Sequence, residues 1–254
     1  SKLSDKFVEL NALRAVFIRR GRLEMLPKDI ETLEYINRFD VSFNNLQTFN
    51  VDILKWKQLN ELHLLFNNIT EHNENLWQHP ELVNLFVNNN FGLQMSTNVK
   101  LPRLTLLDVS NNSISIPQLS FDNIPAINDL YLDGNAMTKL PETLSSLKNT
   151  LLYLGVARCQ LTSLGNLDAL TKLLYLDARN NSLTSVSKEI KTMIKETDGF
   201  ESYFSGNPVC ASDTELNCTE LCTEYCWSHT GFGNGVCDST CDSPKCQFDG
   251  GDCR

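Results

Sequence analysis

The sequence has no long hydrophobic run, and most of it has almost no cysteine. Of nine cysteines in 254 residues, only Cys159 lies in the first 209, and the other eight lie between Cys210 and Cys253. The longest apolar stretch, residues 151–157, is far shorter than the roughly 18 residues that suggest a membrane helix. The sequence therefore argues against a membrane-spanning segment and confines any disulfide framework to its C-terminal end.

Positive charge is also scarce. The formal net charge is −9, and residues 205–254 hold −6 of it, eight carboxylates against Lys245 and Arg254. This balance argues against nucleic acid as a partner, because phosphates need a basic face. Eight cysteines in a short acidic tail indicate an oxidising, extracellular environment, as for a secreted or cell-surface protein. No charged-then-apolar leader opens the chain, so we expect a mature form or a piece of a longer protein.

Catalytic motifs are absent as well. The chain has four histidines but no H-E-x-x-H, no G-x-S-x-G and no glycine loop for phosphate. We therefore predict that the protein is not an enzyme.

The main signal that is present is a repeat of 22–24 residues. The pattern L-x-x-L-x-L-x-x-N-x-L recurs eight times and predicts, in each repeat, a short strand whose leucines point inward. Its first positions are Leu13, Ile36, Leu59, Leu82, Leu104, Ile127, Leu151 and Leu173. No repeat has a core of its own, so stability comes from stacking neighbours.

The pattern resembles the leucine-rich repeat family over roughly residues 3–210. The resemblance implies an α/β fold, a curved solenoid with a parallel concave sheet and an irregular or short-helical convex side. We expect this solenoid at residues 1–209, with about eight repeats plus partial ends. Leu3, Phe7 and Leu10 align with the convex half of the next repeat, so we expect further repeats or a cap upstream. The alternative is that residues 1–12 form a modest helical cap on their own.

An asparagine follows the strand in most repeats. Its amide can donate to and accept from backbone groups that the turn leaves unpaired. Cys159 takes this position in the seventh repeat, and we interpret it as a buried free thiol.

Beyond the eighth repeat, residues 188–195 predict a helix and residues 204–210 a ninth, partial repeat. Cys210 is the expected start of a C-terminal cap at residues 210–221, with Cys218 as its most plausible partner.

The last six cysteines follow the spacing C-x3-C-x10-C-x3-C-x4-C-x6-C, with the motifs 233–238 and 249–252. Residues 222–254 closely resemble the LNR module (Lin-12/Notch repeat). So short a segment needs disulfides and a metal to hold it. Six cysteines allow 15 pairings; the resemblance implies Cys222–Cys246, Cys226–Cys241 and Cys237–Cys253.

The resemblance also implies a structural Ca²⁺ in this module, since oxygen ligands suit that ion. Asn234, Asp238, Asp249 and Asp252 match the side-chain ligand positions. The long spacer after Cys226 departs from the family pattern, with His229 and Gly231 where some members carry another aspartate. The alternative is that these acids only solubilise the module.

The variable strand positions predict a ligand surface on the concave face. Arginines at positions 14, 19, 20 and 38 make the first repeats basic, whereas later repeats are acidic and rich in tyrosine, a residue favoured at interfaces. The predicted ligand-binding residues are Phe86, Asp108, Asp129, Tyr131, Asp133, Tyr153, Tyr175 and Asp177. The alternative is that a sheet facing water needs such residues anyway.

Four glycosylation triplets begin at Asn68, Asn111, Asn180 and Asn217, of which we expect one or two to be used. We predict an extracellular recognition module, the ligand-binding ectodomain of a receptor-like or adhesion protein, with a protein or glycan partner and membrane attachment only through segments outside this chain. The alternatives are a soluble secreted binder or inhibitor of a foreign enzyme, and a structural matrix spacer.

Overall fold

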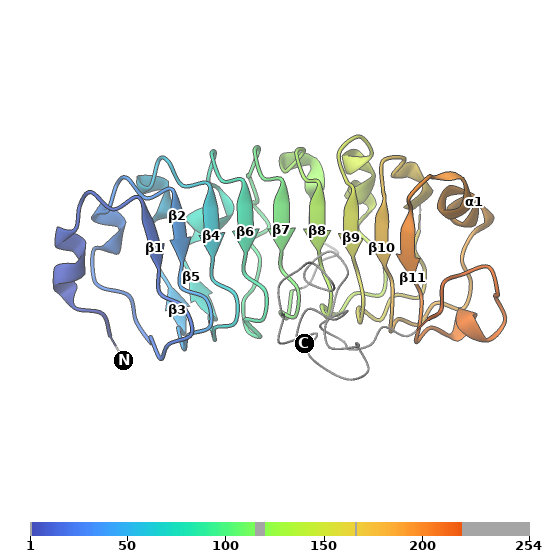
Figure 1. Cartoon of the computed structure of the whole chain (residues 1–254), viewed down its shortest axis with the longest axis horizontal. Helices are drawn as coiled ribbons and strands as arrows, with labels where there is room; N and C mark the ends of the chain where they lie inside the picture. The colour runs from blue at the N-terminus through green and yellow to red at the C-terminus, as the bar shows by residue number, and fades with distance from the viewer. Residues whose placement is uncertain (1, 115–119, 166, 220–254) are drawn as a thin grey trace, which may run out of the picture. The chain divides into compact units, whose positions relative to one another are not determined.

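A sheet of short parallel strands dominates the computed structural model, which describes residues 2–114, 120–165 and 167–219. Nine strands lie side by side in chain order (Figure 1). They are β1 (Ala15–Phe17), β2 (Arg38–Asp40), β4 (Glu61–His63), β6 (Asn84–Phe86), β7 (Leu106–Asp108), β8 (Asp129–Tyr131), β9 (Tyr153–Gly155), β10 (Tyr175–Asp177) and β11 (Glu201–Tyr203). The predicted α/β leucine-rich repeat solenoid is confirmed, and a ninth strand, β11, precedes the partial repeat expected at residues 204–210.

The register of the sheet follows directly from the repeat. Val16 pairs with Phe39, which pairs with Leu62, and the same central position continues along the sheet. These central side chains point into the coil and are buried, while their neighbours on either side face outward. Residues separated by one repeat in the sequence therefore become neighbours in a column.

Short helical turns complete the coils on the other side. Within the described residues they are 3-10 helices, apart from one α-helix, α1 (Lys188–Glu196), which confirms the predicted helix near the end of the array. The 3-10 helices are η1 (Asp5–Glu9), η2 (Ile30–Thr32), η3 (Ile53–Lys55), η4 (Glu74–Trp77), η6 (Phe121–Asn123), η7 (Glu142–Leu147), η8 (Leu167–Ala169) and η9 (Pro208–Ala211). A small second sheet pairs β3 (Thr48–Phe49) with β5 (Glu71–His72), which the sequence pattern did not predict.

The core lies between the sheet and these turns. Leucines of successive repeats fill it, together with the fully buried Trp56 and Trp77. The Trp56 ring packs on Phe39 of the same repeat, with 4.8 Å between ring centroids. Burying a large apolar side chain contributes about 1.5–3 kcal/mol, so stacking supplies the stability that one repeat lacks.

The asparagines form a buried ladder of hydrogen bonds between repeats. Asn90, which is fully buried, donates from Nδ2 to the carbonyls of Leu64 (3.0 Å) and Val87 (2.9 Å). Its Oδ1 accepts from the amide of Ile69 at 3.0 Å. One side chain thus satisfies backbone groups of its own repeat and of the preceding repeat.

Cys159 is a free, buried cysteine that breaks this ladder. A thiol offers no amide oxygen, and here the Cys159 carbonyl itself accepts from the amide of Met137 at 2.8 Å. Gln160, the next residue, has a positive φ of 66°. The backbone turn therefore supplies the acceptor that the side chain lacks.

The end of the array is closed by several contacts. Ser187 caps α1 by accepting from the amide of Ile190 at 3.2 Å, and Lys191 pairs with Asp213. The predicted disulfide joins Cys210 to Cys218. The chain divides between Asn217 and Cys218, within the segment 210–221 expected to be the cap.

Candidate functional site

The outward face of the nine-stranded sheet is the candidate site. Its exposed side chains form two columns, because each residue lies beside its equivalent in the next repeat. One column runs from Ala15 to Glu201 at the first strand position, and the other runs from Phe17 to Tyr203 at the third. Equivalent residues of successive repeats therefore lie in line along this face.

The acidic, tyrosine-rich part of this face is built by β6 to β10. Phe86, Asp108, Asp129, Tyr131 and Tyr153 are all partly exposed there. Asp129 of β8 pairs in register with Tyr153 of β9, so a carboxylate and a phenol lie side by side at the centre of the surface. These five predicted residues are available to a partner.

Three other predicted residues are buried instead. Tyr175 is 2% exposed because its ring lies between those of Tyr153 (6.0 Å between centroids) and Tyr203 (5.7 Å). Asp177 is fully buried and takes a bidentate ion pair from Arg179, whose Nε lies 2.9 and 3.0 Å from the two carboxylate oxygens. Both side chains point toward the outward face, but their neighbours cover them.

Asp133 is the third buried residue, and it is 2% exposed. Its Oδ1 accepts from the amide of Ala157 at 2.7 Å, and its Oδ2 accepts from the Ser110 hydroxyl at 3.3 Å. Its carboxylate fills the space beside Gly155, where a Cβ would collide with Oδ2. Asp133 therefore supports the surface from beneath.

Burial changes the acidity of this group of carboxyls. It raises the pKa of Asp133 to about 8, with a further contribution from the negative charge of Asp177. Burial also raises the pKa of Asp108 to about 6 and that of Asp129 above its usual value. Burial also raises the pKa of the Tyr131 phenol above that of free tyrosine.

The basic end of the face is organised differently. Phe17 in β1 is 52% exposed, and the guanidinium carbons of Arg19 and Arg38 each lie 5.2 Å from its ring centroid. Arg19 also pairs with the buried Asp40, and Arg38 pairs with Glu61 at 2.7 Å. Although burial raises the pKa of Asp40, hydrogen bonds from Arg19 and Ser42 hold it below its usual value.

His63 of β4 lies beside two acidic side chains, with ring nitrogens 3.9 Å from Asp40 and 3.5 Å from Glu61. It stacks on Phe86 with 4.4 Å between ring centroids, and burial lowers its pKa. The histidine is therefore neutral at pH 7 and packs as an aromatic ring.

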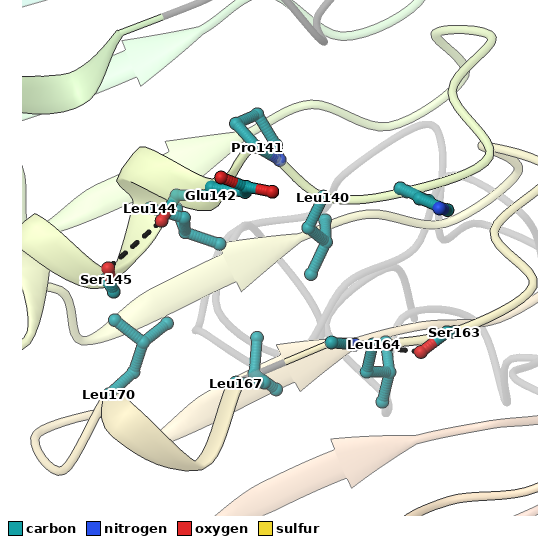
Figure 2. Close-up of a pocket in the computed structure, with 11 residues that line it drawn as sticks. Leu140, Pro141, Glu142, Leu144, Ser145, Ser163, Leu164, Leu167 and Leu170 are labelled. Atoms are coloured by element: carbon teal, nitrogen blue, oxygen red, sulfur yellow. Dashed lines mark hydrogen bonds between the residues drawn. The ribbon is translucent and has the colours of Figure 1, made fainter.

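A separate hollow lies between η7 and η8, on the helical side of the coil. Figure 2 shows leucines 140, 144, 164, 167 and 170 around it, with Glu142, Ser145 and Ser163 among its polar residues. Its volume is about 420 Å³. The Ser145 hydroxyl donates to the Glu142 carbonyl at 3.0 Å, so part of its polar edge is already paired. The sequence pattern did not predict this cavity.

Exposure separates the predicted glycosylation positions. Asn68, Asn180 and Asn217 are exposed, whereas Asn111 is partly buried. The amide oxygens of Asn111 and Asn180 lie close against Gly134 and Gly206 of the next repeats. Asn68 is therefore the least crowded candidate of the three that lie within the repeats.

The remaining predictions fall on the tail. The three LNR disulfides and the calcium ligands Asn234, Asp238, Asp249 and Asp252 lie outside the described residues. Within the described ranges, no group of three or more histidine, cysteine or acidic residues could hold a metal. The same ranges contain no helix long and apolar enough to cross a membrane.

Comparisons with known proteins agree with both parts of the sequence. The family model described as Notch, LNR domain, matches residues 216–254. An uncharacterized leucine-rich repeat-containing protein of Schizosaccharomyces pombe is 31% identical over 110 residues, which are 43% of this chain and 18% of that protein. The chain thus spans a small part of this curated relative.

Solved structures share the solenoid. A leucine-rich repeat protein of Leptospira interrogans has a TM-score of 0.73 and 25% identity, covering 82% of this chain and 52% of that one. An internalin of Listeria monocytogenes has a TM-score of 0.62 and 17% identity, covering 81% of this chain and 64% of that one. The second likeness shows the fold alone.

The repeat, the parallel sheet and the asparagine ladder define a solenoid of the leucine-rich repeat class. Residues 216–254 add the second part. The chain is a leucine-rich repeat protein with a C-terminal LNR module. Both parts are of kinds that serve protein interaction.

Proposed function

We propose that this chain is an extracellular protein-recognition module, the ligand-binding part of a receptor-like or adhesion protein, and that it is not an enzyme. The observation that carries the proposal is the outward face of the sheet, where aromatic and charged side chains stand in register on adjacent strands. The disulfide at Cys210 and the LNR match support an oxidising, extracellular setting.

The partner we propose is a protein that contacts Phe86, Asp108, Asp129, Tyr131 and Tyr153. These side chains combine rigid aromatic area with negative charge, which is typical of interface centres. The buried Asp133, Tyr175 and Asp177 hold this surface in place. Nucleic acid is not a proposed partner, because the surface is acidic.

A double variant tests this surface. Asp129→Arg with Tyr153→Ser changes two adjacent, partly exposed residues, whereas Glu196→Arg changes one charge on the exposed end of α1 and serves as a control. The biotinylated chain and its variants are screened against an array of purified ectodomains. We expect partners of the wild type to lose at least about tenfold in affinity for the double variant and to bind the control normally. A partner that binds the wild type, the double variant and the control equally contradicts the assignment of the surface. If no ectodomain in the array binds the wild type, the proposed recognition of extracellular proteins is contradicted.

We further propose that the LNR module at residues 222–254 holds a structural Ca²⁺ through Asn234, Asp238, Asp249 and Asp252. The family match over residues 216–254 and the oxygen-rich sequence support this. Chelation should accelerate proteolysis within residues 222–254, and Asp249→Asn with Asp252→Asn should do so even with Ca²⁺ present. The thermal transition of the solenoid, followed by circular dichroism, should stay unchanged. Equal cleavage with and without chelator would count against the calcium site.

A further inference from the structure

A second surface lies beside the ends of the first three strands. One turn position in every repeat has a positive φ, and in the first three repeats it is occupied by Arg20, Phe43 and Phe66. The rings of Phe43 and Phe66 are stacked, with 4.6 Å between centroids and 10° between planes. The guanidinium carbon of Arg20 lies 5.7 Å from the Phe43 centroid. We call these three residues the arginine–phenylalanine ridge.

The backbone does not favour phenylalanine at this position. Phe43 and Phe66 have φ values of 57° and 52°, in the left-handed region where bulky residues are strained. Asparagine occupies the same position in three later repeats and glycine in two others, and these residues adopt such values readily. They are Asn89, Asn111, Asn180, Gly134 and Gly206, with φ from 51° to 76°.

The core does not require the two rings either. Phe43 is 39% exposed and Phe66 is 41% exposed. Scattered exposed apolar residues are ordinary, but a stacked and contiguous group marks an interaction surface.

Positive charge accompanies this apolar area. Arg20 forms no ion pair with any residue in the described ranges, and its guanidinium lies over the Phe43 ring. Arg19 and Arg38 have acidic partners, so the uncompensated charge beside the rings belongs to Arg20.

We propose that the arginine–phenylalanine ridge docks an acidic segment of a partner protein, whose apolar side chains cover the two rings while a carboxylate pairs with Arg20. One face of Phe43 is covered by Arg20 and the other by Phe66, so the ring presents its edge to solvent. A ring edge suits aliphatic and aromatic side chains, which favours a protein over a sulfated glycan. The proposal rests on the proposed role in protein recognition but uses a different surface from the one around Asp129.

The chain itself supplies conservative test variants. Phe43→Asn with Phe66→Asn places in these turns the residue found at positions 89, 111 and 180, so the fold is expected to persist. Arg20→Gln removes the charge alone. Tyr35→Ala is the matched control, because Tyr35 is 52% exposed and lies before β2 by as many residues as Phe43 lies after it. Circular dichroism and thermal melting confirm folding of each variant.

The probe is a random 12-residue peptide library displayed on phage and selected against the biotinylated chain. We expect enriched peptides to combine acidic with aromatic or aliphatic residues. Their affinity, measured by fluorescence polarisation, should fall about tenfold in the double variant and severalfold in Arg20→Gln, and should weaken with salt. Tyr35→Ala and the Asp129→Arg, Tyr153→Ser variant should bind them normally, which separates this proposal from the previous one.

Other outcomes overturn the proposal. Enriched peptides that bind the double asparagine variant as tightly as the wild type would show that the rings do not contribute. Binding of heparin that depends on Arg20 but not on the rings, without enrichment of acidic peptides, would assign the ridge to an anionic glycan. Concentration-dependent dimerisation abolished by the double variant would assign it to a second copy of the chain.

Discussion

Asp133 makes the stability of the solenoid depend on pH. Burial raises its pKa in the folded chain to about 8, whereas an aspartate in an unfolded chain titrates near 3.9. Below about pH 4 the carboxyl is protonated in both the folded and the unfolded chain, so its burial does not make stability depend on pH. Between about pH 4 and 8 only the unfolded state ionises, so stability falls as pH rises; above about pH 8 the effect levels off.

The size of the effect follows from the linkage relation. Each pH unit inside this window costs about 1.4 kcal/mol, so the free energy of unfolding should fall by about 3 kcal/mol between pH 5 and 7 through Asp133 alone. Asp133→Asn keeps an oxygen acceptor for the Ala157 amide, now 2.7 Å from Oδ1, and removes the titration. Between pH 5 and 7, the free energy of unfolding of the variant should therefore fall by about 3 kcal/mol less than that of the wild type.

Urea unfolding at constant Ca²⁺, followed by far-UV circular dichroism, measures this difference. Asp198→Asn makes the same change in charge at an exposed position and should follow the wild-type pH profile. If Asp133→Asn and the wild type lose stability in parallel from pH 5 to 7, the buried carboxyl is not the source of the pH dependence and the reasoning fails.

Three further predictions concern the ladder, the free thiol and the end of the array. Asn90→Ala removes hydrogen bonds to Leu64, Val87 and Ile69 and should cost about 3 kcal/mol in urea unfolding, whereas Asn88→Ala, whose Oδ1 accepts no hydrogen bond within the described residues, should change little. Burial raises the pKa of the Cys159 thiol to about 12, so iodoacetamide should label it only after unfolding; rapid labelling of the native protein would contradict its burial. Replacing Cys210 and Cys218 by serine should lower stability by about 2–3 kcal/mol and expose the end of the array to proteolysis; an unchanged melting temperature would show that the bond adds nothing.

Much of the fold was predictable because the repeat is regular. The spacing of the leucines identifies each strand, and parallel stacking places equivalent residues side by side, so Asp129 beside Tyr153 follows from the sequence. The asparagine ladder was predictable for a similar reason, since a buried turn leaves backbone groups that a short amide can satisfy. Cys159 as a buried thiol follows from its place in that ladder.

The candidate surface was only partly predictable. Strand alternation assigned Tyr175 and Asp177 to the outward face, but it does not report how far neighbouring side chains cover them. Tyr153 and Tyr203 enclose Tyr175, and Arg179 folds over Asp177. The ninth strand, which brings Tyr203 into this row, was signalled only by the partial repeat at its end.

The sequence by itself determined the period, the strands, the inward columns and the point where the solenoid gives way to the cysteine-rich module, because these depend on local alternation and spacing. Only the tertiary structure decided which outward residues remain exposed. Exposure depends on side chains one repeat away: the missing Cβ of Gly155 makes room for Asp133, while Phe43 and Phe66 stack at the surface with Arg20. Such contacts join residues from different repeats, and no pattern within a single repeat contains them.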